Sequence, residues 1–558
     1  MPEWKGFFWR FLPFGLALLI LAFHATINFR QATDQPSPGW SRTLPVGSIE
    51  YEGATVPALL ESGAAIILNT TQSGITYHLI SADGTAGASG DLALDRGSYN
   101  GLSAIGGKQV DLFFSSEASG RGTVAFTTVG PDAKVQFRPA TIATGALGYG
   151  ARQVRDGVAV FVFTKDGLSL YRRSGQGYVA TGTPHKAPGQ MASFDVQVLA
   201  DDSFLAVADM DQGEGHHVLY AMRGTLADGV REGAAVGQFT YKGTGMTSYI
   251  VRPVVFGVDT THAYLFTTVD QSSRGDREST VTLYTAPLAD WKSTWQPKVM
   301  GAAGPVSDQV MGGRLENPHT VPGQNASLQV LFQAQTASRF TRNLGLVMGT
   351  LKDGKLQSVE LVSHGKGTLR PAVARGPLGL LVTFASVTGG SDQGINAVSS
   401  APAFVRGRQS LTGDDMSRVA MDSLLDIFAI FNPVLSAGIW WTPMVLIIGT
   451  LYVFALNWME RDTRRAFFLA VGISVPLQIY TAFTSLSGEA YTQAMPEWMA
   501  VPWVIAVIYL GVSALMTGYV LKTRPPTKYA NVLAPVGYWS VSTIILTGLF
   551  FGPFMRKG

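Results

Sequence analysis

The feature that most constrains this chain is a unit of two short β-strands that recurs seven times along its middle. Each unit has an apolar strand, a polar turn that contains glycine, and a second strand with alternating side chains. The first strands begin at residues 65, 110, 158, 204, 263, 328 and 380, so successive copies start 45 to 65 residues apart. Short alternating segments between glycine and aspartate turns are typical of β-structure. Recurrence at this spacing indicates a stacked or radial repeat architecture.

The spacing is close to the length of one propeller blade, which needs about 40 to 50 residues for four strands. Short apolar segments precede several hairpins and would supply the inner strands, as in Thr55–Ala58, Arg252–Val255 and Arg370–Val373. Residues 47–403 therefore resemble β-propellers as an architecture, without matching one particular family, and we predict an all-β domain with seven blades. Two unrelated β-sandwiches in tandem are the alternative. The leftover β-like segment Val46–Tyr51 is expected to close the ring by adding a strand to the last blade.

The N-terminal region is apolar, unlike the middle of the chain. Charged residues make up 15% of the sequence, below the ~25% usual for soluble proteins. Phe11–Phe29 is a charge-free run between Arg10 and Arg30. It would form about 28 Å of helix, which is close to the thickness of the hydrocarbon layer. We predict a membrane anchor here, and a cleaved signal peptide is the alternative.

The C-terminal region contains four more charge-free stretches. They are Ile427–Met459, Ala466–Gly488, Trp498–Leu521 and Tyr529–Met555. The last three are each long enough to span a bilayer once. The first is longer, and we expect an interfacial lead-in followed by a span that begins near residue 437. The sequence thus predicts an α-helical membrane domain with one N-terminal span and four C-terminal spans.

The loops between these stretches indicate the orientation. Residues 460–465 and 522–528 carry three cations each, whereas Ser487–Trp498 contains two glutamates and no lysine or arginine. The positive-inside rule places the first two loops and the N-terminus in the cytoplasm. The middle domain is then extracytoplasmic. The two cations near the C-terminus, Arg556 and Lys557, would face outside and disagree with the rule.

The expected domain order runs from an N-terminal anchor to a helical membrane domain. The segments are the anchor (1–30), a linker (31–46), the extracytoplasmic propeller (47–403), a linker with an interfacial helix (404–436) and a four-helix membrane domain (437–558). This order of one span, a large outer β domain and a helix bundle is similar to that of YidC-type membrane-protein insertases. The charge-bearing groove of that family is not visible in this sequence.

Three basic side chains form the first candidate ligand site. Arg252, His319 and Arg370 each lie just before or inside a predicted inner strand of units five, six and seven. Inner strands of a propeller converge on the central channel, so these side chains are expected near its mouth. Two guanidiniums and an imidazole suit an anionic ligand such as a carboxylate or phosphate. The alternative is that each arginine pairs locally with an acid or a backbone carbonyl.

An acidic turn forms the second candidate site. Asp209 and Asp211, followed by Gly213, resemble the start of a D-x-D-x-G loop, and several carboxylate oxygens in one tight turn suit Ca²⁺. The downstream bidentate acid of an EF-hand is missing, and a solvated hairpin turn is the alternative. Adjacent His216 and His217 would face opposite sides of a strand. We therefore expect no obligatory cofactor, with Ca²⁺ as the one candidate ion.

Several function classes are disfavoured by what the sequence lacks. The chain has no cysteine, which excludes disulfides, thiolate zinc sites and cysteine nucleophiles. A net charge of +3 is too small to indicate nucleic-acid binding. The chain contains no G-x-S-x-G, H-E-x-x-H or P-loop motif. The predicted spans carry no charged residue at mid-depth, where transporters usually place one.

These observations favour a binding or scaffold subunit of an envelope membrane complex over an enzyme. A single span would suffice for tethering, so four extra helices imply a membrane-protein partner within the bilayer. The expected location is the cell membrane, with several spans. The alternative function is an enzyme that acts on an envelope glycan or lipid, with its site on the propeller mouth.

Overall fold

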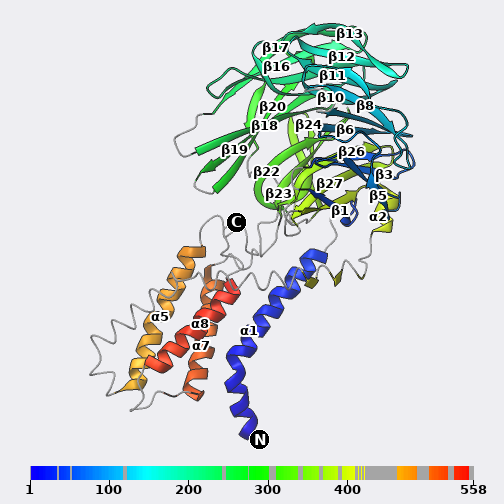
Figure 1. Cartoon of the computed structure of the whole chain (residues 1–558). Coiled ribbons are helices and arrows are strands. Elements are labelled where there is room, and N and C mark those ends of the chain that lie inside the picture. The colour runs from blue at the N-terminus through cyan, green and yellow to red at the C-terminus, as the bar shows by residue number, and fades with distance from the viewer. Residues whose placement is uncertain are drawn as a thin grey trace. The chain divides into compact units, whose positions relative to one another are not determined.

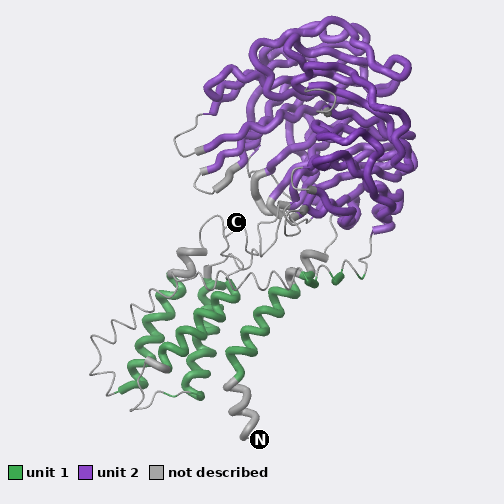
Figure 2. The backbone as a smooth tube through the Cα atoms, in the orientation of Figure 1, with its two compact units in different colours: residues 1–34, 337–342, 411–558 green, residues 35–336, 343–410 purple. Residues whose placement is uncertain are grey.

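The computed structural model describes residues 2–33, 37–50, 53–116, 122–241, 247–273, 276–300, 310–323, 325–336, 344–363, 368–387, 392–408, 462–486, 502–523 and 533–551, with short pieces between 413 and 421 and residue 525. The chain divides into two compact units (Figure 2). Unit 1 comprises residues 1–34, 337–342 and 411–558, and unit 2 comprises residues 35–336 and 343–410. The described residues of unit 2 are mainly in strands, and those of unit 1 are mainly in helices (Figure 1).

The described strands of unit 2 form seven antiparallel sheets of four strands each. In blades 1 to 3, neighbouring strands of a sheet are consecutive in the sequence. Blade 1 contains β2 (Thr55–Leu59), β3 (Ala65–Thr70), β4 (Ile75–Ile80) and β5 (Ala86–Asp91). Blade 2 contains β6 (Tyr99–Gly106), β7 (Val110–Ser116), β8 (Val124–Val129) and β9 (Ala140–Ala143). Blade 3 contains β10 (Ala146–Val154), β11 (Gly157–Thr164), β12 (Gly167–Ser174) and β13 (Gly177–His185).

Blades 4 to 6 also consist of four consecutive strands, and blade 7 combines three consecutive strands with β1 (Leu44–Glu50). Blade 4 contains β14 (Gln190–Val198), β15 (Ser203–Asp211), β16 (His216–Thr225) and β17 (Gly229–Thr240). Blade 5 contains β18 (Thr247–Val258), β19 (His262–Ser273), β20 (Asp276–Pro287) and β21 (Gln296–Val299), with the short 3₁₀ helix η2 (Leu288–Asp290) before β21. Blade 6 contains β22 (Val310–Thr320), β23 (Leu328–Thr336), β24 (Leu344–Lys352) and β25 (Lys355–Ser363). Blade 7 contains β26 (Leu369–Gly376), β27 (Gly379–Val387), β28 (Asp392–Ser399) and β1 (Leu44–Glu50).

The first strand of each blade contacts the first strand of the next, and β26 of blade 7 contacts β2 of blade 1. The seven sheets therefore close into a ring, and unit 2 is a seven-bladed β-propeller. The prediction of this architecture is confirmed, and the alternative of two tandem sandwiches is wrong. The repeated hairpins are the second and third strands of the blades, and each second strand begins within one residue of its predicted start.

Blade 7 takes its outer strand from the other end of the domain. β1 pairs antiparallel with β28, from Leu44 opposite Ala397 to Glu50 opposite Asp392. This confirms that the segment before the first full unit closes the ring, although the strand begins at Leu44, two residues earlier than expected. The side chains of Leu44 and Ile49 are buried in the core between blades 7 and 1. Closure thus joins strands from the two ends of the propeller sequence.

The second strands read as continuous apolar runs because both of their faces are covered by neighbouring blades. In β15, Leu205 shares a buried cluster with Phe256 of blade 5. Its neighbour Phe204 points the other way, and its ring lies 4.8 Å from that of Phe161 in blade 3. Alternation therefore places successive side chains in two different inter-blade cores.

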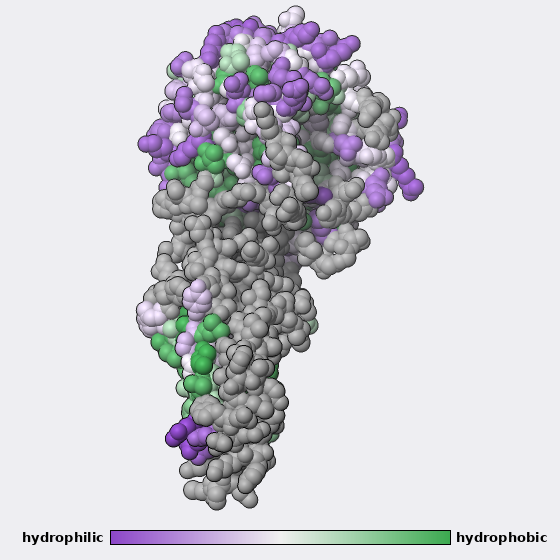
Figure 3. Space-filling view, turned by 90° about the vertical axis from the view of Figure 1, so that its left-hand side faces the viewer, coloured by the Kyte–Doolittle hydropathy of each residue, from purple (hydrophilic) through white to green (hydrophobic). Residues whose placement is uncertain are grey.

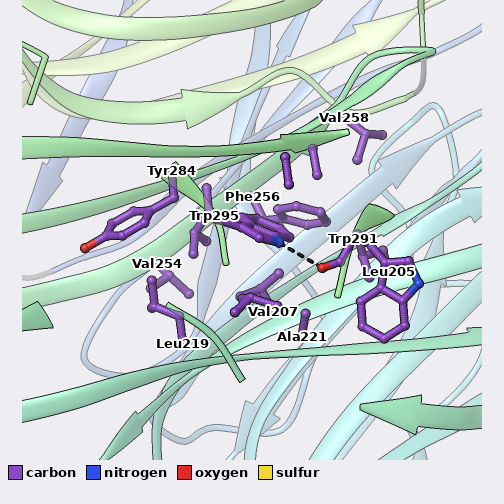
Figure 4. Close-up of a cluster of buried hydrophobic side chains, with 14 of the residues drawn as sticks. Leu205, Val207, Leu219, Ala221, Val254, Phe256, Val258, Tyr284, Trp291 and Trp295 are labelled. Carbon is purple, nitrogen blue, oxygen red and sulfur yellow. Dashed lines mark hydrogen bonds between the residues drawn. The ribbon is translucent and has the colours of Figure 1, made fainter. Parts of the chain in front are cut away.

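The core between blades 4 and 5 shows how such a layer is filled (Figure 4). Val207 and Leu219 of blade 4 face Val254 of blade 5, and the two tryptophans that follow η2 cover the cluster. The indole Nε1 of Trp295 donates a hydrogen bond of 2.9 Å to the backbone oxygen of Trp291. The buried indole therefore keeps a partner for its only donor.

The chain enters and leaves the propeller at neighbouring points. The backbone N–H of Ser41 donates to the backbone oxygen of Ser399 at 2.9 Å. The helix α2 (Pro402–Gly407) follows, and Arg408 at its end donates to the backbone oxygen of Thr43 at 3.0 Å. These contacts tie the first and last described segments of unit 2 to each other.

Unit 1 contains the long described helices. They are α1 (Pro2–Thr33), α5 (Thr463–Leu486), α7 (Pro502–Thr523) and α8 (Leu533–Phe551). Helix α7 contacts α5, α8 and α1, and α8 also contacts α1 and α5. The N-terminal helix is therefore part of the same bundle as the C-terminal helices.

One described helix segment, Trp503–Thr523, is long and apolar enough by itself to cross a membrane. Phe11–Thr26 and Pro535–Phe551 are shorter apolar helices. Three of the four predicted C-terminal stretches coincide with α5, α7 and α8, whereas the stretch 427–459 lies outside the described residues. The described helices thus support one span, and the other predicted spans stay predictions.

Candidate functional site

Most inner strands of the propeller are irregular. Each of β6, β10, β14, β18, β22 and β26 shows a shift of register against the second strand of its blade. A β-bulge inserts a residue and turns the neighbouring side chains to new directions. In blades 5, 6 and 7 the irregular stretches contain the three predicted ligand residues or lie beside them. The sequence Arg252-Pro253 marks one of them, and Arg370-Pro371 marks another.

Arg252 is engaged on two sides. Its Nε donates to Oδ2 of Asp270 in β19 at 2.8 Å, and one terminal nitrogen donates to Oδ1 of Asn317 in β22 at 3.0 Å. The Asp270 side chain is 3% exposed and also accepts a hydrogen bond from the hydroxyl of Ser279. A local acid therefore pairs with Arg252, as the alternative to ligand binding expects. The guanidinium also connects blade 5 to blade 6.

His319 lies beside this group on β22 and is half-buried. Burial, with the positive charge of Arg252 as the second cause, lowers the pKa of His319 to about 4. The imidazole is therefore neutral at physiological pH. Its Nε2 has no hydrogen-bond partner among the residues that the structure describes. A neutral imidazole can accept a hydrogen bond there, but it adds no charge toward an anion.

Arg370 has an unusual backbone. Its φ is +48°, the same value as that of Asn317 in blade 6, and each residue precedes a proline. The structural counterpart of Arg370 in blade 6 is therefore Asn317, and His319 lies two residues further along the chain. One terminal nitrogen of Arg370 donates to the backbone oxygen of Gly53, just before β2. This arginine thus connects blade 7 to blade 1.

The structure brings two of the three predicted residues together. Arg252 lies close enough to His319 to lower the pKa of that imidazole, at the junction of blades 5 and 6. Arg370 lies at the junction of blades 7 and 1. Both arginines reach from their own blade to the following blade. The inner ring is therefore held by side-chain bonds at these places, and anion binding by Arg252, His319 and Arg370 stays a prediction.

The predicted metal pair is split between two environments. Asp209 is fully buried in β15, and its Oδ1 lies 2.7 Å from Nδ1 of His217 in β16. Burial raises the pKa of Asp209, although the hydrogen bond and charge of His217 act in the opposite direction. Asp211 is exposed, and its Oδ1 accepts a bond of 2.7 Å from the backbone N–H of Gly213. As expected, His216 faces outward and His217 inward.

These contacts leave the Ca²⁺ prediction without added support. Asp211 closes the hairpin turn, which is the role that the solvated-turn alternative assigns to it. Within the described ranges, the structure contains no group of three or more His, Cys, Asp or Glu side chains arranged to hold a metal ion. Metal binding by Asp209 and Asp211 stays a prediction.

A second link between inner strands was not visible in the sequence. Arg152 of β10 donates to the backbone oxygen of Val196 at 2.6 Å and forms an ion pair with Asp195 in β14. The other oxygen of Asp195 accepts a bond of 2.8 Å from the N–H of Phe256 in blade 5. Burial raises the pKa of Asp195, and Arg152 opposes this shift. The only sequence signal is that both side chains fall on successive inner strands.

Comparisons with known proteins do not identify a function for this chain. No protein-family model matches the sequence, and no curated protein matches it. A crystal structure of BBS1N in complex with ARL6DN shares 10% identity and a TM-score of 0.33, covering 63% of this chain and 97% of that one. A sialidase of Trypanosoma rangeli in complex with sialic acid shares 11% identity and a TM-score of 0.35, covering 67% and 61%. The α-L-arabinofuranosidase Arb93A of Fusarium graminearum shares 7% identity and a TM-score of 0.31, covering 52% and 89%. Similarities of this size carry no functional argument.

Proposed function

We propose that this protein is a membrane-anchored, extracytoplasmic propeller that acts as a binding or scaffold subunit of a membrane complex. The observation that carries the proposal is the inverted distribution of side chains in the helices of unit 1. Water-soluble bundles bury apolar residues and expose polar ones. A bundle in lipid exposes apolar residues and keeps its polar groups inside.

The described helices follow the second pattern. Hydroxyl and amide side chains are buried, with exposed fractions of 5% or less; they are Ser474, Gln478, Ser513, Ser540, Thr543 and Thr547. Large apolar side chains are more than 40% exposed on the same helices; they include Phe468, Ile473, Trp503, Val507, Leu510 and Leu515. Figure 3 shows hydrophobic residues on the visible surface of the described helices and hydrophilic residues over much of the propeller's visible face. Such an exterior is stable in hydrocarbon and unfavourable in water.

The N-terminal helix supports anchoring over a cleaved signal. Leu16 and Ile20 of α1 pack against the buried cluster that contains Met516 of α7 and Trp539 of α8. A segment that contributes to the interior of the bundle is needed in the mature protein. The proposed topology has a cytoplasmic N-terminus, four returning spans and an extracytoplasmic propeller, in line with the cationic loops 460–465 and 522–528.

The proposed partner is another membrane protein within the bilayer. Trp503, Val507 and Leu510 follow a spacing of four and three residues, so they form one exposed apolar stripe along α7. Tethering alone requires a single helix, and the additional helices provide lateral surface for a partner. On the propeller, the inter-blade bonds of Arg252 and Arg370 favour a rigid platform for recognition. Binding of an anionic group at these arginines belongs to the same proposal.

Alkaline extraction and cysteine labelling test the membrane part, because the chain has no native cysteine. The full-length protein should stay with the membrane after a carbonate wash. Asp166→Cys in the exposed turn between β11 and β12 should react with an impermeant maleimide in intact cells. Thr527→Cys in the cationic loop should react only after permeabilisation. Labelling of Thr527→Cys in intact cells, with Asp166→Cys protected, would reverse the proposed orientation.

Crosslinking tests the scaffold part. A photoreactive residue at Val507 or Leu510 should crosslink to one defined membrane protein, and the same probe at the buried Met516 should not. A monodisperse, monomeric particle in mild detergent, without crosslinked partner at either exposed position, would contradict a scaffold role.

A further inference from the structure

Three helices of unit 1 bury a hydroxyl side chain at their midpoints. Ser474 is residue 12 of the 24 in α5, Ser513 is residue 12 of the 22 in α7, and Thr543 is residue 11 of the 19 in α8. Their exposed fractions are 1%, 3% and 0%. Helices α5, α7 and α8 contact one another, and each of these hydroxyls lies halfway along its own helix.

The three hydroxyls have no hydrogen-bond partner in the part of the chain that the structure describes. Buried serine and threonine in helices ordinarily donate to the carbonyl one turn back. Ser540 does so to Val536 at 2.8 Å, and Thr547 does so to Thr543 at 2.7 Å. Ser474, Ser513 and Thr543 therefore depart from the pattern that Ser540 and Thr547 follow. A buried polar group without a partner is costly, so a partner other than these helices is expected.

The same faces remain polar beyond the midpoints. On α7 the polar positions follow at intervals of four residues, and on α8 at intervals of three and four, so each set shares one helix face. The sets are Tyr509, Ser513 and Thr517 on α7; Ser540, Thr543 and Thr547 on α8; and Ser474 and Gln478 on α5. Trp539 of α8 joins two of them by donating to Thr517 Oγ1 at 3.1 Å and to the Ser513 backbone oxygen at 3.3 Å. The charged residues of these helices, Arg464, Arg465 and Lys522, lie near helix ends.

The chemistry of this polar seam decides what it can hold. Hydroxyl and amide groups both donate and accept hydrogen bonds, and they match water and small neutral solutes. The seam carries no ionised side chain, so an ion entering it would lose its hydration without gaining a counter-charge. We propose that α5, α7 and α8 enclose a hydrated site at mid-depth in the bilayer that takes small uncharged hydrogen-bonding molecules. This inference rests on the proposed membrane location of unit 1.

Cysteine reactivity tests the site, since thiols react as thiolates and these form only where water reaches. The test variants are Ser474→Cys, Ser513→Cys and Thr543→Cys in the full chain, in native-lipid vesicles. The matched controls are Ile473→Cys, Leu510→Cys and Val541→Cys, at nearby positions that are 43%, 52% and 36% exposed on the outer surface. The probe is a small uncharged methanethiosulfonate, compared with a permanently cationic one of similar size.

The expected result is modification by the uncharged probe at least about ten-fold faster at the three inner positions than at the outer ones. The cationic probe should react at least about ten-fold more slowly than the uncharged probe at the same inner positions. Equally slow reaction at inner and outer positions, in protein that resists carbonate extraction, would overturn the site and leave the membrane proposal standing. Equal rates for the two probes would overturn the selectivity for neutral molecules. Release of the protein by carbonate would overturn the membrane proposal and this inference with it.

Discussion

Because β1 closes the propeller, the structure predicts how much stability is lost when a buried side chain of this strand is removed. Ile49 is 5% exposed and packs in the cluster with Leu59, Ile67 and Ile395, between blades 7 and 1. Ile49→Ala removes apolar contacts from this closed site, and changes of this kind cost about 2–5 kcal/mol. Part of that loss falls on ring closure itself, because β1 is the strand that pairs with β28. We expect the free energy of unfolding to fall by about 3 kcal/mol.

The control is Ser48→Ala on the same strand. Ser48 is exposed, and its backbone keeps the pairing with Gly394, so its replacement should change stability by less than about 0.5 kcal/mol. Both variants are compared as full-length protein in detergent by equilibrium denaturation, with protease resistance of the propeller as an independent readout. Deletion of residues 44–50 should be more severe, because it exposes the edge of β28. Equal stabilities for Ile49→Ala and Ser48→Ala would refute closure by β1 as a source of stability.

Three further predictions concern the inner strands. Arg252→Gln leaves the buried carboxylate of Asp270 without its ion pair, and denaturation should show a loss of about 3 kcal/mol; unchanged stability would remove the structural role of the pair. The pKa of His319 is lowered to about 4 by burial and then by Arg252, so the folded state resists its protonation. The stabilisation from the neutral imidazole is fully present above pH ~6.5 and is lost as the pH falls through about 4, and the loss is about 3 kcal/mol. His319→Asn should remove that part of the pH dependence. Arg370→Asn should weaken binding of a phosphate or carboxylate probe by about ten-fold, and loss of the bond to Gly53 should lower the melting temperature as well. A lower melting temperature with unchanged anion binding would contradict anion binding at Arg370 and leave only its contact with Gly53.

The blades could be predicted from the sequence because each hairpin is a local structure. Alternation and glycine turns lie within about 20 residues of each other, and the second strands therefore appeared within one residue of their predicted starts. The closing strand was predictable for a different reason. Seven complete hairpins left one β-like segment over, and a ring needs that segment at its edge.

The contacts of the candidate site could not be predicted in the same way. Asp270 and Asn317 meet Arg252 from a different strand and a different blade, at separations of 18 and 65 residues. Asp209 and Asp211 read as one acidic turn, but Asp209 lies within the covered part of β15 and Asp211 is its exposed last residue. The two aspartates differ in burial, and the sequence pattern does not show which of two nearby residues is covered. Asp209 therefore pairs with His217, whereas Asp211 belongs to the turn.

The two Arg-Pro sequences show how far a matching motif determines geometry. Arg252 keeps its place opposite Thr268 in the ladder, whereas Arg370 adopts a φ of +48° within the bulge. The left-handed conformation is unfavourable for arginine by about 1–2 kcal/mol and is better tolerated by asparagine. Asn317 occupies the same conformation before a proline in the neighbouring blade. Replacement by alanine would therefore change both the guanidinium and the backbone preference. Asparagine at position 370 removes the guanidinium while preserving the bulge, and it is the substitution that separates a ligand-binding arginine from one that holds two blades together.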